Sequence, residues 1–176
     1  MTTPVEPQLH YIAYDDFLAD VRKVALKIDS EAWKPDFVIG IGRGGLVPAV
    51  YISHQLDLPM LSIDHSSKVH DFADELLAKV ATKSAAGIRL LFVDDINDSG
   101  GTIVYIRQLL ADNGCDPANL RFAVIINNSR SKAHVEYWTQ TIDRAEDKRW
   151  FVFPWEAVAS GGAIVAEAIS VPERLA

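Results

Sequence analysis

The sequence predicts an α/β protein whose parallel, twisted sheet carries helices on both faces. Short runs of four or five apolar residues, the pattern of strands buried on both sides, alternate along the chain with longer amphipathic segments. Two of these runs also lead into glycine-rich turns that open a helix. We expect strands near Phe37–Ile41, Met60–Ile63, Leu90–Val93 and Phe122–Ile126.

The helices between these strands follow from the spacing of apolar residues and from signals at the helix ends. The first helix begins at Asp15 or Asp16, because acidic residues favour a first turn and the apolar side chains after them share one face. That face comprises Phe17, Leu18, Val21, Val24, Ala25 and Ile28. A second helix follows the first strand, with Pro48 acceptable in its first turn. A later helix can end at Asn113-Gly114.

Length and composition predict one compact domain over residues 1–176. With 49% hydrophobic residues the chain can fill a substantial core. A net charge of −7 argues against a nucleic-acid surface. No apolar run is long enough for a membrane span, and residues 1–10 lack a signal-peptide pattern, so we expect a cytoplasmic protein without a membrane partner. A single cysteine, Cys115, excludes an intramolecular disulfide.

The most informative motif follows the run Leu90–Val93. Two carboxylates, Asp94 and Asp95, come directly after the strand, and Asp98 opens a glycine-rich turn that leads into a helix. Unpaired N–H groups and the helix dipole at such a turn can bind a phosphate dianion. These groups belong to Ser99, Gly100, Gly101 and Thr102. The two carboxylates suit ribose hydroxyls or the waters of Mg²⁺.

Three other interpretations of this motif compete with phosphate binding. The start of the motif imitates a calcium-binding EF-hand loop, but Ile106 stands where a bidentate Glu is required, and a strand precedes it instead of a helix. The Asp-Asp-x-x-Asp of prenyl-diphosphate enzymes lies within a helix, which Gly-Gly would weaken by about 2 kcal/mol. A structural acidic turn is the remaining alternative, although three neighbouring carboxylates repel one another unless a cation joins them.

A second glycine-rich turn follows the run Phe37–Ile41. Its Gly40, Gly42 and Gly45 form a G-x-G-x-x-G, and Asp64 lies about where a dinucleotide-binding fold places its ribose-binding acid. A dinucleotide fold, however, gives no reason for the acidic turn some fifty residues later. Arg43 inside the glycine loop also suits a leaving diphosphate better than a nicotinamide site.

The stretch Val93–Thr102 closely resembles the phosphoribosyl-diphosphate (PRPP) motif of type I phosphoribosyltransferases. The resemblance implies the type I phosphoribosyltransferase fold, PRPP and Mg²⁺ as ligands, and PRPP binding by Asp94, Asp95 and the turn from Asp98 to Thr102, with Asp94 and Asp95 at the metal. It implies that Asp98 abstracts or balances the proton of the base. It also implies that Gly42, Arg43 and Gly44 bind diphosphate, with a cis peptide between Gly42 and Arg43.

Trp150–Glu156 resembles the hood segment of 6-oxopurine phosphoribosyltransferases, those acting on xanthine, guanine or hypoxanthine. The hood would span about residues 127–160. By this match Trp150 and Phe151 stack on the purine, and Glu156 lies close to a second metal or to the exocyclic group. Ser66, Ser67 and Lys68 resemble the start of the mobile catalytic loop of the family. Such a loop excludes water from an activated anomeric carbon.

The chain departs from the family pattern after the strand ending at Ile126, where a lysine is expected to donate to the purine 6-oxygen. Asn128 can donate there through its amide, and Arg130 and Lys132 are nearby cations. We therefore expect a purine-salvage phosphoribosyltransferase that uses PRPP and a 6-oxopurine and forms a homodimer or homotetramer. The alternatives are a non-catalytic PRPP- or nucleotide-binding regulator of the same fold and a dinucleotide-binding protein.

Overall fold

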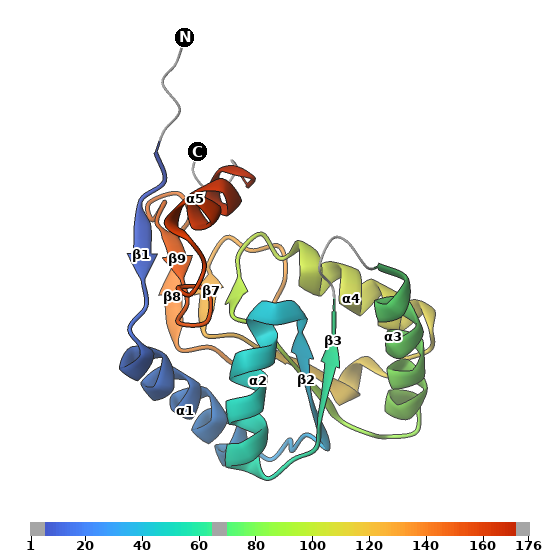
Figure 1. Ribbon diagram of the computed structural model, residues 1–176. Coiled ribbons are helices and arrows are strands. Elements are labelled where there is room, and N and C mark those ends of the chain that lie inside the picture. The colour runs from blue at the N-terminus through green and yellow to red at the C-terminus, as the bar shows by residue number, and fades with distance from the viewer. Residues whose placement is uncertain (1–5, 65–69, 172–176) are drawn as a thin grey trace.

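The computed structural model describes residues 6–64 and 70–171, with the backbone alone for residues 70–73. A four-stranded parallel sheet in the order β3-β2-β4-β6 forms the centre of the molecule (Figure 1). Its strands are β2 Phe37–Ile41, β3 Met60–Ile63, β4 Leu90–Val93 and β6 Leu120–Ala123. The α/β class, the parallel sheet and the first three strand boundaries are confirmed.

The fourth expected strand is divided, which corrects the prediction of one strand over Phe122–Ile126. Strand β6 ends at Ala123, and Ile126 begins another strand, β7 Ile126–Asn128. The N–H of Val124 donates to Tyr137 O, whereas the N–H groups of Ile125 and Ile126 both donate to Asp95 O. Because of these hydrogen bonds, the chain leaves the central sheet after β6 and enters a second sheet at β7, although the apolar run itself is continuous.

Four helices cover the two faces of the central sheet, as predicted. They are α1 Tyr14–Ser30, α2 Gly42–Leu56, α3 His70–Ala85 and α4 Gly101–Asp112. Successive strand residues alternate between the faces: Val38 packs in one core with α1 and α2, and Ile39 packs in the other with α3 and α4. Among the described residues, no helix is long and apolar enough to cross a membrane.

Two helix-end predictions need correction. The residue before α1 is Ala13, so Asp15 and Asp16 lie inside the first turn and do not cap it. Pro48 lies in the second turn of α2 because the helix begins as early as Gly42. The end of α4 agrees with expectation: the helix stops at Asp112, and Gly114 follows with φ 78°.

A smaller layer, which we call the hood, lies beyond the carboxyl ends of the central strands (Figure 1). Strand β1 Leu9–Tyr11 pairs in parallel with β9 Trp150–Val152. A second small sheet has the order β5-β7-β8, with β5 Ile96–Asn97 and β8 Gln140–Ile142, and helix α5 Gly161–Ile169 packs over β9. The hood thus includes β1 and α5, which lie outside the predicted range 127–160. A short 3₁₀ helix, Pro117–Asn119, precedes β6.

Candidate active site

The two glycine-rich turns meet at one edge of the central sheet because β2 and β4 are adjacent parallel strands. A Cβ on Gly45 would lie 2.1 Å from Val93 O, and a Cβ on Gly44 would lie 2.4 Å from a carboxylate oxygen of Asp95. The loop around Arg43 therefore packs directly on the acidic pair, and only residues without a side chain permit this approach.

The expected cis peptide between Gly42 and Arg43 is wrong. Every peptide bond among the described residues is trans. Gly42 instead has φ 56°, a left-handed conformation that glycine adopts without strain. This conformation turns the chain from β2 directly into α2.

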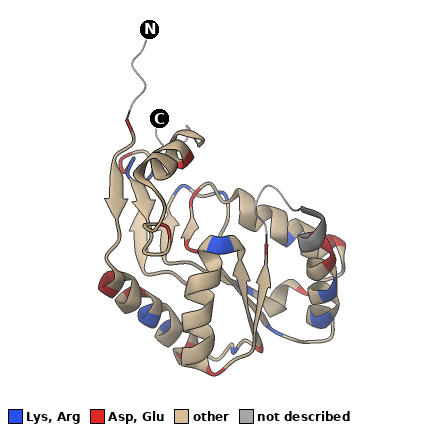
Figure 2. Cartoon of the chain, viewed as in Figure 1, with Lys and Arg blue, Asp and Glu red and all other residues tan. Residues whose placement is uncertain are grey.

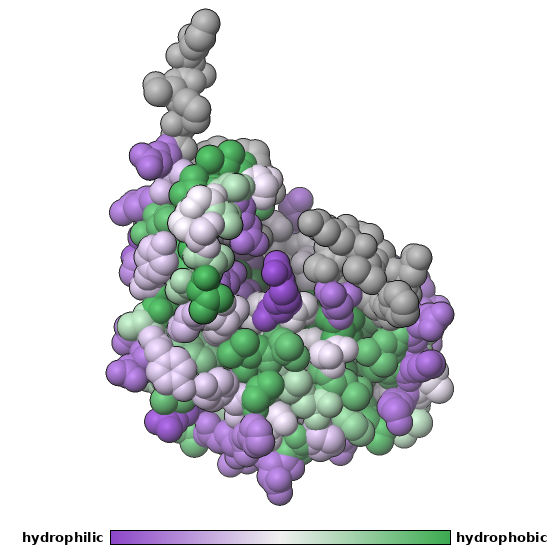
Figure 3. All heavy atoms as spheres, viewed as in Figure 1, coloured by the Kyte–Doolittle hydropathy of each residue, from purple (hydrophilic) through white to green (hydrophobic). Residues whose placement is uncertain are grey.

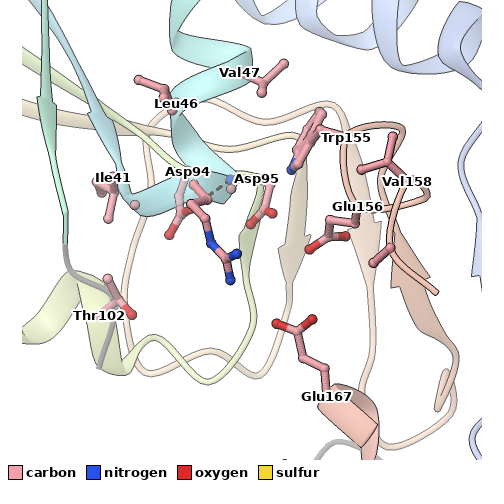
Figure 4. A pocket seen from close by; sticks show the side chains of 14 residues that line it. Ile41, Leu46, Val47, Asp94, Asp95, Thr102, Trp155, Glu156, Val158 and Glu167 are labelled. Carbon is pink, nitrogen blue, oxygen red and sulfur yellow. Dashed lines mark hydrogen bonds between the residues drawn. The ribbon is translucent and has the colours of Figure 1, made fainter. Parts of the chain in front are cut away.

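A cavity of about 590 Å³ opens between this edge and the hood (Figure 4). In the space-filling view, a strongly hydrophilic group stands in the hollow above the apolar surface over α2 (Figure 3). The first turn of α2 also carries the single Lys or Arg residue of that helix (Figure 2). The cavity wall includes Gly42, Arg43, Gly44, Asp94, Asp95, Thr102, Trp155, Glu156, Val158 and Glu167.

Local hydrogen bonds hold the acidic pair at the end of β4. The N–H of Asp95 donates to Asp94 Oδ1 over 3.0 Å, and the N–H of Ile96 donates to Asp95 Oδ1 over 2.7 Å. The described residues contain no cluster of three or more His, Cys, Asp or Glu suited to a metal. Two carboxylates nevertheless fit Mg²⁺, which binds through one or two carboxylates together with substrate oxygens and water.

The predicted phosphate turn forms a small hollow of about 30 Å³ beside the larger cavity. Ser99, Gly100, Gly101 and Thr102 all line it, and Asp94 and Thr102 line both spaces. Helix α4 begins at Gly101, so the hollow lies at a helix N-terminus where backbone N–H groups and the dipole favour an anion. Gly100 has φ 83°, and a Cβ there would lie 2.6 Å from Ala133 N.

Asp98 also lines the small hollow, and its side chain is held by an arginine that sequence reasoning did not identify. Arg144 Nε lies 3.0 Å from Asp98 Oδ1, and Arg144 Nη2 lies 2.9 Å from Oδ2. The side chain of Arg144 is 11% exposed, and that of Asp98 is 5% exposed. No motif surrounds Arg144, which follows β8 in an irregular segment of the hood, so no sequence signal indicated it.

Asn128, the residue expected to replace the family's lysine at the base, braces the chain instead. Its side chain is buried, and Nδ2 donates to Asp98 O over 3.0 Å. Its Oδ1 accepts from the N–H groups of Arg130 and Arg144. The Arg130 side chain forms an exposed ion pair with Asp143. The amide of Asn128 therefore has partners within the protein.

The structure does not bring Trp150 and Phe151 to the cavity wall. Trp150 is buried with Ile164 and Ala168 beneath α5. Phe151 packs edge-to-face against His10, with 5.5 Å between ring centroids. Their strand, β9, is paired with β1, so both rings contribute to the packing of the hood.

Trp155, further along the same segment, is the aromatic residue of the cavity wall. Its ring stacks on that of Phe153, with 4.8 Å between the ring centroids, and its buried Nε1 has no hydrogen-bond partner among the described residues. An indole nitrogen of this kind is a donor only. The predicted catalytic loop, Ser66, Ser67 and Lys68, lies outside the described residues.

Glu156 and Glu167 extend toward the cavity from the hood segment and from α5 (Figure 4). Burial raises the pKa of Glu156 from its ordinary 4.5 to about 7; a hydrogen bond from Phe153 N lowers it, and the charges of Asp95 and Glu167 raise it. The Arg43 guanidinium lowers the pKa, and it is the smallest of these influences. Glu167 was not predicted, because nothing in the α5 sequence distinguishes it from an ordinary surface carboxylate.

We expect Glu156→Gln to remove a pH-dependent loss of stability. With a folded-state pKa of about 7 and an unfolded value near 4.5, the folded protein holds the proton more tightly, so stability falls as pH rises through this window. The variant should lack this fall, on the order of 2 kcal/mol. Thermal melting should show the variant melting above the wild type at about pH 8 and level with it at about pH 5. Exposed Glu146→Gln is the control, and an equal difference at both pH values would contradict the prediction.

Comparisons with known proteins agree on one family. The family model described as the phosphoribosyl transferase domain matches residues 10–168. Among curated relatives, the xanthine-guanine phosphoribosyltransferase of Cereibacter sphaeroides is 28% identical over 163 residues, covering 87% of this chain and 89% of that protein.

Two solved structures support the same fold. A hypothetical protein from Neisseria gonorrhoeae with bound ppGpp matches with a TM-score of 0.67 and 22% identity, over 95% of this chain and 97% of that one. A purine phosphoribosyltransferase from Pyrococcus horikoshii matches with a TM-score of 0.62 and 24% identity, over 86% and 96%. At these identities the likeness concerns the fold.

Proposed function

The chain belongs to the phosphoribosyl transferase domain family, and from this membership we propose that it transfers the 5-phosphoribosyl group of PRPP to a 6-oxopurine base. It has the type I phosphoribosyltransferase fold that the sequence predicted. One observation supports the proposal most directly. The Arg43 loop, the pair Asp94 and Asp95, and the phosphate turn line two adjoining cavities. The products would be a nucleoside monophosphate and diphosphate.

Each part of PRPP has a suitable partner in this arrangement. The 5′-phosphate suits the N–H groups at the start of α4, since that end of a helix favours a dianion. Asp94 and Asp95 suit the ribose hydroxyls. The guanidinium of Arg43, with the backbone of Gly42 and Gly44, suits the departing diphosphate.

The chain's own residues would promote the transfer mainly by position and charge. A purine nitrogen attacks C1 of the ribose as diphosphate leaves, so negative charge grows beside Arg43 while positive charge grows on the sugar. Asp98 balances or accepts the proton of the base, a contribution typically worth about 10²–10⁴ in rate. The hood covers this edge and limits the access of water.

Mg²⁺ is the proposed cofactor, and Asp94 and Asp95 would hold it. The ion would neutralise negative charge on the diphosphate. We expect transfer and tight PRPP binding to require Mg²⁺ or Mn²⁺. Assays with excess chelator, then with each metal restored, measure this requirement. Full activity in chelator would contradict it.

A 6-oxopurine is the favoured base because a relative named xanthine-guanine phosphoribosyltransferase matches most of the chain and because Trp155 offers an aromatic wall. Turnover assays of purified protein with PRPP, Mg²⁺ and a panel of bases test the proposal. At least one of hypoxanthine, guanine and xanthine should react. Adenine and uracil should be at least about tenfold poorer in kcat/KM, as expected for one mispaired group. Preference for adenine or a pyrimidine would overturn the base assignment.

We expect Arg43→Ala to weaken the binding of PRPP and diphosphate by about 2–3 kcal/mol, because charge-assisted hydrogen bonds to an anion are lost. A nucleoside monophosphate, which lacks diphosphate, should bind almost as before. Isothermal titration calorimetry with each ligand measures the difference. Arg89→Ala, at the opposite end of β4, is the matched control and should change neither affinity. Equal weakening for the monophosphate would contradict the assignment of Arg43 to diphosphate.

The regulator is the second candidate, since a structural neighbour holds ppGpp. A regulator would bind PRPP or a nucleotide without turnover, and it would not need the carboxylate of Asp98 for proton transfer. Binding of a dinucleotide such as NAD without binding of PRPP would favour the third candidate. A homodimer or homotetramer stays a prediction, which light scattering of the purified protein can test.

A further inference from the structure

Arg144 connects the phosphate turn to the hood through nearly all of its donors. Nε and Nη2 hold the carboxylate of Asp98, as described above. Nη1 donates to the backbone oxygens of Asp147 and Arg149, over 3.1 and 2.7 Å. With only 11% of the side chain exposed, this guanidinium is fixed by five contacts on two sides.

The same turn is held a second time through its backbone. Asn128 Nδ2 donates to Asp98 O, and Asn128 Oδ1 accepts from the backbone N–H of Arg144. Both the main chain and the side chain of Asp98 are thereby attached to one hood network. A planar guanidinium that donates to both oxygens of a carboxylate fixes the plane and direction of that carboxylate. A lysine ammonium would not fix them in this way.

We propose that Arg144 is a positioning residue for the transfer reaction, orienting the Asp98 carboxylate for the proton of the base. This inference rests on the proposed function. The chemical reason is that a buried carboxylate is costly as an anion unless it is paired and hydrogen-bonded. Arg144 supplies both charge and geometry, although it lies some distance along the chain from the phosphate turn.

The network also links Asp98 to the strand that packs the hood. Arg149, whose backbone oxygen accepts from Arg144, directly precedes β9, and the Arg144 guanidinium lies 5.3 Å from the ring centroid of Phe151 on that strand. A displacement of β9 would therefore turn the guanidinium, and with it the carboxylate. The orientation of the Asp98 carboxylate therefore depends on the position of β9 in the hood.

Steady-state kinetics of Arg144→Met test the inference, with PRPP, Mg²⁺ and the best purine of the panel. We expect kcat to fall about 30-fold or more, while KM for PRPP stays within about threefold, because Arg144 acts through Asp98 and not on PRPP. The double variant Arg144→Met/Asp98→Asn should be no slower than Asp98→Asn alone within about twofold, since two changes along one path are non-additive.

Arg130→Met is the matched control, because it removes another guanidinium–carboxylate pair of the hood that does not touch Asp98. Its kcat should equal that of the wild type within about twofold. Arg144→Lys keeps the charge and loses the two-point grip, so its kcat should lie between those of the wild type and the Met variant. Added guanidinium ion should partly restore kcat in Arg144→Ala and leave Arg130→Ala unchanged.

The outcomes separate this inference from the proposed function. A wild type that turns over purine, with Arg144→Met and Arg144→Lys as active as Arg130→Met, overturns the positioning role alone. Losses that multiply in the double variant, or no rescue by guanidinium in a folded Arg144→Ala, also overturn it. A wild type inactive with every base overturns the proposed function and this role together. Thermal melting of each variant identifies unfolded protein, and Arg144→Lys decides the question if Arg144→Met does not fold.

Discussion

Asp98→Asn should lower kcat by about 10²-fold or more and leave the affinity for PRPP within a few-fold. An amide cannot take up the proton of the base, so the loss falls on the chemical step and not on binding. The amide oxygen can still accept from Arg144, which preserves much of the local structure. Pre-steady-state turnover measures the chemical step, and calorimetry with PRPP measures binding.

Asp143→Asn is the control for this substitution, because Asp143 also pairs with an arginine of the hood but lies far more exposed than Asp98. Its kcat should stay near that of the wild type. An unchanged kcat in Asp98→Asn would remove Asp98 from the chemistry and strengthen the regulator as the second candidate. Weaker PRPP binding of the same size as the kcat loss would show that Asp98 serves the phosphate turn and not the base.

The central sheet could be predicted from sequence because its signals are local. Four consecutive apolar residues such as Leu90–Val93 indicate a strand buried on both faces, and the structure confirms the boundaries. The same holds for the two glycine-rich turns, whose residue types are required by close approach of the backbone. Gly44 and Gly45 pack on the end of β4 in the way that their lack of side chains permits.

The hood could be predicted only in part because its contacts are long-range. Strand β1 pairs with β9, which lies about 140 residues later, and nothing near Leu9–Tyr11 signals the partner. The aromatic segment resembles a hood segment, yet its sequence does not say which ring faces the cavity. Trp150 packs against α5, Phe151 packs in the core that includes α1 and α2, and the turn after that strand leaves Trp155 at the wall.

Charge partners were the least predictable part of the site. The acidic residues Asp94, Asp95 and Asp98 form a recognisable motif, whereas Arg144 and Glu167 belong to no sequence motif. Ion pairs are decided by where segments meet in space, and the hood brings Arg144 to a carboxylate that lies 46 positions earlier in the chain. The absence of the family's lysine is visible in the sequence. The sequence does not show, however, that Asn128 forms its hydrogen bonds within the protein.

Gly45→Ala should cause the largest structural effect of any single methyl group at this site. The added Cβ would lie 2.1 Å from Val93 O and 2.9 Å from Asp94 Cα, and both are backbone atoms that cannot rotate away. Helix α2 would have to move off the end of β4. Overpacking of this kind costs about 1–3 kcal/mol or more, and about 1 kcal/mol lowers Tm by roughly 2–4 °C in a chain of this size.

The same displacement separates Arg43 from the acidic pair, so PRPP affinity should fall more than tenfold even in the fraction that remains folded, a loss above about 1.4 kcal/mol. Thermal melting and calorimetry with PRPP measure the two effects in one preparation. Gly162→Ala is the control: a Cβ there meets nothing within 4 Å, and alanine within a helix is favoured over glycine, so Tm should hold or rise. A Gly45→Ala protein with wild-type Tm and wild-type PRPP affinity would mean that α2 does not rest on β4 as described, and the joint diphosphate and metal site would lose its structural basis.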